Sequence, residues 1–115
     1  MMNIEAYDFG TIRVEGATYM SDVIIMPDSV KDSWWRREGH NLCIEDLTDV
    51  IATKPDVLVI GTGYYGRMKV PVATKSYLEA RGIKVHIVKT GQAVKEFNEL
   101  QRRIGKVIAA LHLTC

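Results

Sequence analysis

The 115-residue sequence has no apolar run long enough to cross a membrane. Its longest apolar runs, Val23–Met26, Val57–Ile60 and Val107–Leu111, fall far short of the roughly 20 residues that a spanning helix needs. The first residues include Glu5 and Asp8 and lack the basic start and apolar stretch of a secretory signal. We therefore expect no membrane association and a cytoplasmic location.

The sequence contains only two cysteines, which argues against a zinc site or a set of disulfides. Cys43 and Cys115 do not form a zinc-ligand pair, and His112, three residues before Cys115, adds only one further candidate ligand. We expect no metal, no disulfide framework and two reduced thiols. A chain of this length in which 47% of the residues are hydrophobic forms a core without such staples, so we expect one domain, residues 1–115.

Strong net charge is absent as well. Residues 1–66 carry 5 basic and 11 acidic residues, net −6, whereas residues 67–115 carry 10 basic and 3 acidic residues, net +7, which leaves a total of +1. This small total argues against a general nucleic-acid role. The second half either forms a basic face that meets an acidic partner, or its charges interleave with those of the first half.

The apolar residues that are present predict strands first. Ile12 and Val14 alternate with polar residues, Glu15-Gly16 supplies a turn, and Thr18 to Met26 follows, which predicts a β-hairpin or meander. Asp22, at the start of the apolar part of this segment, is interpreted as a partly buried structural carboxylate.

Adjacent tryptophans mark the next predicted strand, residues 30–37. On a strand, Trp34 and Trp35 point to opposite faces, one inward and one outward. The outward indole either covers a neighbouring helix or forms a contact surface, because exposed indoles are enriched at interfaces. The predicted partner surface consists of Trp34, Trp35, Arg36 and Arg37.

From residue 45 onward, helical and strand patterns alternate. The predicted elements are a helix over 44–53 ended by Lys54-Pro55, a strand over 56–60, a helix over 71–81 ended by Gly82, a strand over 83–89, and a helix capped by Thr90 that runs to 104. The segment 106–115 either continues that helix or forms a strand, and Gly105 favours the strand. These elements predict an α/β domain with a central mixed sheet, helices on its faces and N-terminal hairpins.

Gly61 to Gly66 fits the spacing G-x-G-x-x-G directly after a strand, which is the dinucleotide-binding pattern. Two features argue against that function. Residues 67–71 delay the next helix, so a phosphate would lose the helix dipole, and no acidic residue for a ribose occurs from Ala80 to Lys95. We therefore predict no nicotinamide, flavin or other cofactor.

The same loop has two other interpretations. Its glycines either permit only a tight reversal, or its backbone N–H groups hold a small anion with help from basic side chains. His40, in a loop of mixed charge, is the histidine best suited to a functional role, and no catalytic constellation is evident. The predicted ligand residues are Gly61, Thr62, Gly63, Tyr64, Gly66, Arg67 and His40.

Residues along nearly the whole chain resemble the MTH938-like domain family. The residues that carry the resemblance are Phe9-Gly10, Trp35-Arg36, Gly39-His40, Lys54-Pro55-Asp56, Gly61-Thr62-Gly63, Phe97-Asn98 and His112 through Thr114-Cys115. The resemblance implies a three-layer fold with a central mixed sheet and a strand as the last element. It implies no established reaction. Relatives include a mitochondrial assembly factor for respiratory complex I and a protein associated with adipogenesis.

Two hypotheses of function follow. The first is a non-enzymatic binding or assembly module that acts through residues 34–40 and the basic second half. The second is a small-molecule or anion-binding protein, or an enzyme, that uses the loop of residues 61–66. An exposed tryptophan and an edge strand are also compatible with a homodimer.

Overall fold

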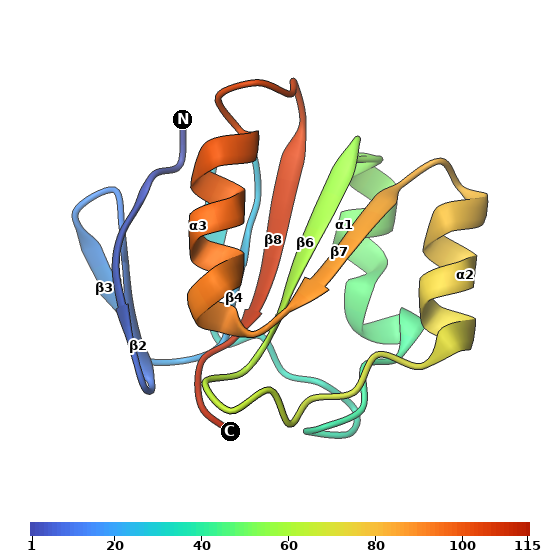
Figure 1. Ribbon diagram of the computed structural model, residues 1–115, viewed down its shortest axis with the longest axis horizontal. Helices are drawn as coiled ribbons and strands as arrows, with labels where there is room; N and C mark the ends of the chain where they lie inside the picture. The colour runs from blue at the N-terminus through green and yellow to red at the C-terminus, as the bar shows by residue number, and fades with distance from the viewer.

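The computed structural model describes all 115 residues and contains two β-sheets, three α-helices and one 3-10 helix (Figure 1). The first sheet is antiparallel, with the order β1 (Ile4–Asp8), β2 (Thr11–Val14), β3 (Ala17–Tyr19). The second has the order β5 (Val30–Lys31), β4 (Val23–Ile25), β8 (Val107–His112), β6 (Val57–Thr62), β7 (Lys84–Val88). The helices are η1 (Ile44–Leu47), α1 (Thr48–Thr53), α2 (Val72–Ala80) and α3 (Thr90–Leu100).

β8 is the central strand of the second sheet. It runs parallel to β6 and antiparallel to β4, and β7 runs parallel to β6 on the far side. Every residue of β6 and β8 is buried, as expected for strands covered on both faces. The prediction of a mixed sheet whose last element is a strand is confirmed.

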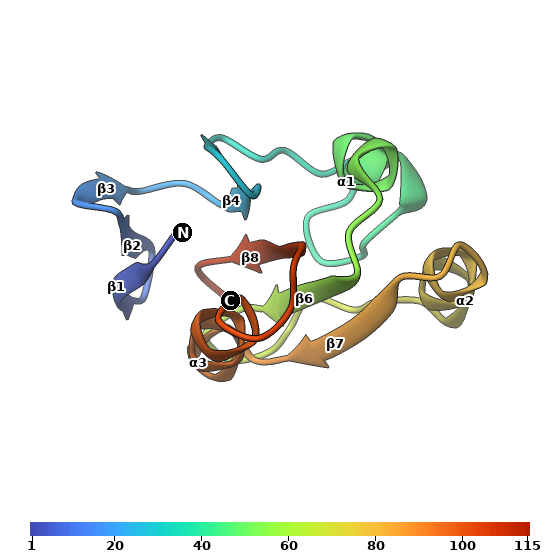
Figure 2. The same cartoon turned by 90° about the horizontal axis from the view of Figure 1, so that it is seen from above.

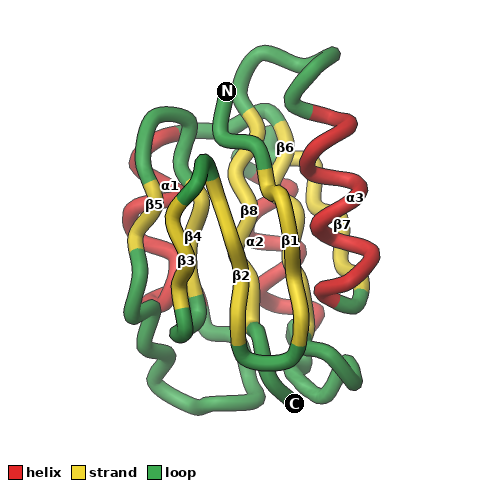
Figure 3. The backbone as a smooth tube through the Cα atoms, turned by 90° about the vertical axis from the view of Figure 1, so that its left-hand side faces the viewer, coloured by secondary structure: helices red, strands yellow, loops and turns green.

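The molecule has three layers (Figure 2). Alternate residues of β6 point to opposite faces: Leu58 and Ile60 pack with residues of η1, α1 and α2, whereas Val57 and Val59 pack with α3 and the first sheet. Figure 3 shows the first sheet beside α3, so the two together form one outer layer. Full burial of a large apolar side chain contributes about 1.5–3 kcal/mol, and this alternation lets one strand stabilise both halves of the core.

Two expectations for the first half are wrong in extent. The segment 18–26 is not one strand, because β3 ends at Tyr19 and β4, in the other sheet, begins at Val23. The strand expected over 30–37 ends at Lys31, and Ser33 has a φ of 51°, which ends the extended conformation. The intervening residues form the loops described below.

The helices of the second half lie where expected, with differences at their ends. Lys54 and Gly82, with φ of 54° and 79°, end α1 and α2 in the left-handed conformation. Thr90 is not the cap of α3; it is the first helical residue, after Lys89, and its hydroxyl points into the core. α3 ends at Leu100 rather than at residue 104.

Candidate functional site

Three charged or titratable side chains from distant parts of the chain meet at the carboxyl end of β8: Asp22, Arg36 and His112. His112 is the last residue of β8 and is in register with Thr62, the last residue of β6. Asp22 directly precedes β4, and because β4 is antiparallel to β8, its start lies at the same edge. This edge, where the chain end lies in Figure 1, is where α/β proteins tend to bind ligands.

The Asp22 carboxylate holds the His112 ring in one orientation. Asp22 Oδ2 lies 2.8 Å from His112 Nδ1, and Asp22 Oδ1 accepts a 2.7 Å hydrogen bond from the Leu113 N–H. Because a carboxylate only accepts, this network assigns the proton to Nδ1 and leaves Nε2 as an acceptor. His112 is only 5% exposed, and its Nε2 is buried without a hydrogen-bond partner.

Arg36 completes the cluster. Its Nη1 lies 2.8 Å from Asp22 Oδ2, as an ion pair outside the hydrogen-bond direction, and its Nε donates to the Gly39 carbonyl at 3.0 Å. Arg36 Nη2 also lies 3.1 Å from His112 Nδ1. The contact from His112 Nδ1 to Asp22 Oδ2 is shorter and its acceptor is charged, so the Nδ1 proton is donated to Asp22. The guanidinium also lies 4.8 Å from the centre of the Trp34 ring, in a cation–π arrangement.

These contacts keep Asp22 ionised. Burial alone would raise the pKa of this carboxyl, but the hydrogen bonds from His112 and the Leu113 amide, together with the contact to the Arg36 guanidinium, outweigh burial and lower the pKa below its ordinary value. The carboxylate is therefore a fixed negative charge at neutral pH that compensates the buried arginine.

Asp22 and His112 are arranged like the carboxylate and histidine of a catalytic triad, in which the histidine acts as a base. A serine or cysteine nucleophile is not hydrogen-bonded to this histidine. His112 Nε2 contacts no hydroxyl or thiol. Burial, and then the neighbouring carboxylates of Asp46 and Glu38, raise the pKa of the Cys43 thiol, so that it is protonated at neutral pH. The structure brings the exposed His40 beside His112, with ring centres 5.5 Å apart.

The amides of the glycine loop are engaged within the chain. The N–H groups of Tyr64 and Arg67 donate to the carbonyls of Thr114 and Cys115, at 2.6 and 2.9 Å. The Gly63 N–H donates to Thr90 Oγ1 at 2.8 Å, and the Gly66 and Met68 amides donate back into the loop. Most of the donors expected for an anion are thus used within the chain, and two of them bind the carbonyls of the last two residues.

Two glycines of the loop lie so close to other parts of the chain that a larger residue would not fit. A Cβ on Gly61 would lie 2.7 Å from Thr90 Oγ1, and one on Gly63 would lie 2.6 Å from the backbone of Cys115. Such distances leave no room for a side chain, which supports the tight-reversal interpretation. The loop stays a predicted ligand site through its side chains alone, of which Arg67 is exposed and Tyr64 lines a cavity of about 610 Å³.

The predicted partner surface divides into buried and exposed members. Trp34 is 8% exposed and its Nε1 donates to the Asp46 carbonyl at 2.9 Å, so it belongs to the core. The side chain of Arg36 is also buried, because it pairs with Asp22. Trp35 is 86% exposed and therefore covers no helix, and Arg37 is exposed beside it.

Met20 extends this exposed surface. Its side chain is 83% exposed, and together with Trp35 it lines a cavity of about 310 Å³. We call this the Trp35 surface; its remaining lining residues are Ser21, Asp22, Ser33, Trp34, Arg36 and Gly39. Asp22 and Arg36 thus connect the His112 cluster to the wall of this cavity.

No group of three or more histidine, cysteine, aspartate or glutamate side chains is placed to hold a metal ion. None of the helices combines the length and the apolar character that crossing a membrane requires. Six contacts join a basic or histidine side chain to a carboxylate, and only that of His112 with Asp22 links the acidic first half to the basic second half. The opposite charges of the two halves are therefore not consumed by pairing with each other.

The three-layer arrangement defines a class of mixed α/β domain, and comparison with known proteins places the chain within it. Residues 4–112 match the family described as protein of unknown function (DUF498/DUF598), and the chain belongs to this family. A conserved hypothetical protein of Pyrococcus horikoshii OT3, PH1505, is 28% identical with a TM-score of 0.79 over 99% of this chain and 100% of its own. The protein MT938 is 25% identical with a TM-score of 0.81 over 100% of both chains, which confirms the MTH938-like resemblance.

A third similar structure, from Bartonella henselae, is described as an outer membrane protein. It is 25% identical, with a TM-score of 0.83 over 99% of this chain and 96% of its own. These similarities confirm the predicted three-layer fold.

Sequence reasoning missed the Asp22–His112–Arg36 cluster. It recognised Asp22 as a structural carboxylate and assigned Arg36 to a surface, but no local spacing links residues 90 positions apart. The sequence did contain one signal: Asp22 precedes one apolar strand and His112 ends another. When two such strands are antiparallel neighbours in a sheet, these two positions lie at the same edge.

Proposed function

We propose that this domain is a protein-binding module whose docking site is the Trp35 surface. The observation that carries the proposal is the pair of large apolar side chains, Trp35 and Met20, that remain 86% and 83% exposed beside a cavity of about 310 Å³. Exposed indoles beside a pocket are the residues that most often dominate binding energy at interfaces. The occupant that fits is a partner protein that inserts one apolar side chain into the cavity and packs against the indole.

The two residues next to Trp35 in the chain are held in place, which favours this function. The preceding residue, Trp34, is buried, and its backbone N–H donates to the Asp22 carbonyl at 2.9 Å. The following residue, Arg36, is held by Asp22 and by the Gly39 carbonyl. Because both neighbours are fixed, Trp35 is presented from a rigid backbone, and binding costs less conformational entropy. In this proposal the Asp22–His112–Arg36 cluster is the scaffold of the docking site.

The proposal is tested with a photo-crosslinking residue, p-benzoylphenylalanine, placed at position 35 and, as the matched control, at position 72. Val72, at the start of α2, is 81% exposed and lines none of the cavity. We expect a protein that crosslinks from position 35 and not from position 72. Its affinity should fall by about 30-fold or more for Trp35→Ala, as expected from the loss of about 2 kcal/mol at a hot spot.

Two outcomes count against the proposal. One is the same set of crosslinked proteins from both positions, which indicates only general stickiness. The other is a partner whose affinity is unchanged by Trp35→Ala. A crosslink between two copies of this chain, accompanied by a doubled mass in sedimentation, would make the partner a second copy.

A further inference from the structure

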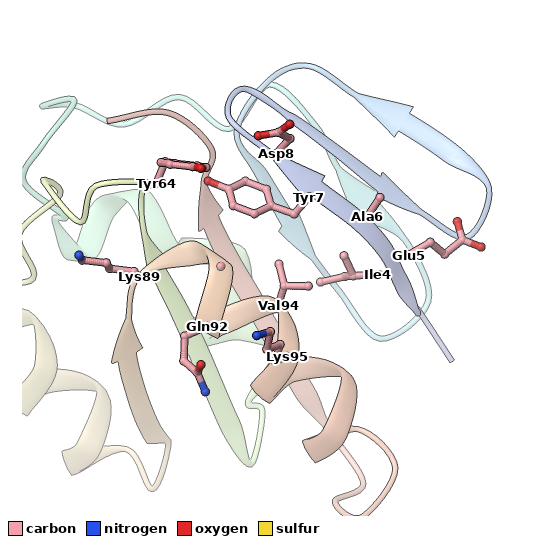
Figure 4. A pocket seen from close by; sticks show the side chains of 11 residues that line it. Ile4, Glu5, Ala6, Tyr7, Asp8, Tyr64, Lys89, Gln92, Val94 and Lys95 are labelled. Atoms are coloured by element: carbon pink, nitrogen blue, oxygen red, sulfur yellow. The ribbon is translucent and has the colours of Figure 1, made fainter.

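A second cavity lies away from the Trp35 surface, between β1 and the first turns of α3 (Figure 4). We call it the β1–α3 cavity. Its volume of about 610 Å³ is within the range of small-molecule sites. It is open to solvent, and its lining residues are Ile4, Glu5, Ala6, Tyr7, Asp8, Tyr64, Lys89, Gly91, Gln92, Val94 and Lys95.

We infer that the β1–α3 cavity binds a small amphipathic anion, with an apolar body against Ile4, Val94 and Tyr7 and a carboxylate or sulfonate head attracted by the positive charges of Lys89 and Lys95. The inference is independent of the Trp35 surface. It also needs none of the loop amides, of which those of Gly63, Tyr64 and Gly66 are already bonded within the chain.

The apolar wall is contributed by two elements that face each other. In Figure 4, Ile4 of β1 and Val94 of α3 lie next to one another on the wall of the cavity. Tyr7 and Tyr64 close one end, with ring centres 6.2 Å apart. The Tyr7 hydroxyl donates to the Leu113 carbonyl at 3.0 Å, so this ring is fixed in place. An apolar body of a ligand therefore meets a preformed surface rather than mobile side chains.

The charges around the cavity favour an anion. Of the two carboxylates, Glu5 is paired with Arg13 and the Gly16 N–H, and Asp8 accepts the Phe9 N–H at 2.7 Å. Lys89 and Lys95 make no ion pair or side-chain hydrogen bond. Of the charged residues that line the cavity, Lys89, Lys95 and Asp8 are thus without an oppositely charged partner, and the two lysines outnumber the single carboxylate.

Two further contacts prepare the site. The aliphatic part of Lys89 lies against Gly66: a Cβ on that glycine would be 3.1 Å from Lys89 Cγ, so the stem of this lysine has little freedom. Burial raises the pKa of Tyr7 to about 12, so its phenol stays neutral and does not repel an anion. The Gln92 amide is engaged with Glu96 at 3.3 Å, which leaves the head group to the lysines.

The test is titration calorimetry of the full chain with octanoate, octanol and octylamine, which share one apolar body and differ in the charge of the head. We expect saturable binding of octanoate and at least tenfold weaker binding of the other two. Octanoate should shift the amide resonances of Gly91 and Val94, which line the cavity. Its affinity should fall as salt rises, since the lysines are exposed.

Two variants with matched controls locate the site. The double variant Lys89→Met, Lys95→Met should weaken octanoate at least tenfold, whereas Lys75→Met, Lys84→Met, at exposed lysines outside the cavity, should not. Gly91→Trp should block binding without loss of fold, because a Cβ at Gly91 meets nothing within 4 Å. Gly39→Trp is its control, since Gly39 has equally open space but lines the other cavity.

The inference is overturned by any of three results: no saturable octanoate binding by the unmodified chain, equal affinity for octanoate and octylamine, or unchanged octanoate affinity in Gly91→Trp. A failure here leaves the Trp35 surface untouched, because the crosslinking experiment probes residues that do not line the β1–α3 cavity.

Discussion

His112 Nδ1 and Asp22 Oδ2 lie 2.8 Å apart although 90 positions separate the two residues in the chain. The pair joins the end of β8 to the start of β4, and Arg36 binds the same carboxylate from the loop that carries Trp35. The proposed docking site and the centre of the sheet are therefore connected through one half-buried negative charge.

Removal of that charge should strongly destabilise the fold. Asp22→Asn keeps the shape of the side chain but leaves the buried Arg36 guanidinium uncompensated. We expect the free energy of unfolding to fall by about 3 kcal/mol, the usual cost of breaking a buried ion pair from one side. Urea denaturation measures this change. The control is Asp28→Asn, an exposed carboxylate just after β4, for which we expect a change within about 0.5 kcal/mol. Equal losses in the two variants would contradict the role given to Asp22.

The same carboxylate should set the acid limit of stability. The pKa of Asp22 in the folded state lies below its ordinary value of 3.8, so the unfolded chain binds this proton more readily than the folded chain. The stabilisation is therefore fully present above pH 3.8 and is lost as the pH falls through the lower, folded-state pKa. Urea midpoints measured from pH 7 downward should show this decline in the unmodified chain. In Asp22→Asn the decline should be shallower; an identical slope would argue against the assignment.

The two adjacent tryptophans should behave in opposite ways. Trp34→Ala removes a core side chain and the hydrogen bond to Asp46, and should cost about 3–5 kcal/mol. Trp35→Ala removes an exposed side chain and should change stability by no more than about 0.5 kcal/mol. Acrylamide quenching of Trp34→Phe and Trp35→Phe provides a second measurement: the former, which retains Trp35, should be quenched much more strongly. Similar quenching of both would mean that Trp35 is covered.

The architecture was predictable from the sequence because its signals are local. The apolar runs of β6 and β8, the stop at Lys54-Pro55 and the glycine at 82 each report on neighbours within a few positions. The opposite orientations of Trp34 and Trp35 were also predictable, although the strand that justified the prediction ends at Lys31.

The site was less predictable because its contacts are not local. The loop amides lie at the expected spacing for an anion, but two of them, those of Tyr64 and Arg67, donate to Thr114 and Cys115, about 50 positions later. Thr90 fits the pattern of a helix cap, yet tertiary contacts turn its hydroxyl to the Gly63 N–H and the His112 carbonyl instead. In both cases the hydrogen-bond partner comes from a distant part of the chain, which the local sequence pattern does not reveal.

The close approach of Gly61 to Thr90 gives the last prediction. Gly61→Ala places a methyl group 2.7 Å from Thr90 Oγ1 and 2.9 Å from Leu111 Cδ2, both in the core, and should cost about 1–3 kcal/mol. Gly91→Ala, where the methyl group meets nothing within 4 Å, should be neutral or stabilising by at most about 1 kcal/mol.

A double-mutant cycle identifies the cause. Thr90→Ala alone should destabilise the fold, because it removes the acceptor of the Gly63 N–H and the donor to the His112 carbonyl. It also removes the oxygen that a methyl group at position 61 would strike. The double variant should therefore lose less stability than the sum of the single variants, by at least about 0.5 kcal/mol in urea denaturation. Additive losses would show that Thr90 is not what excludes a side chain at position 61, and that the glycine is required there for another reason.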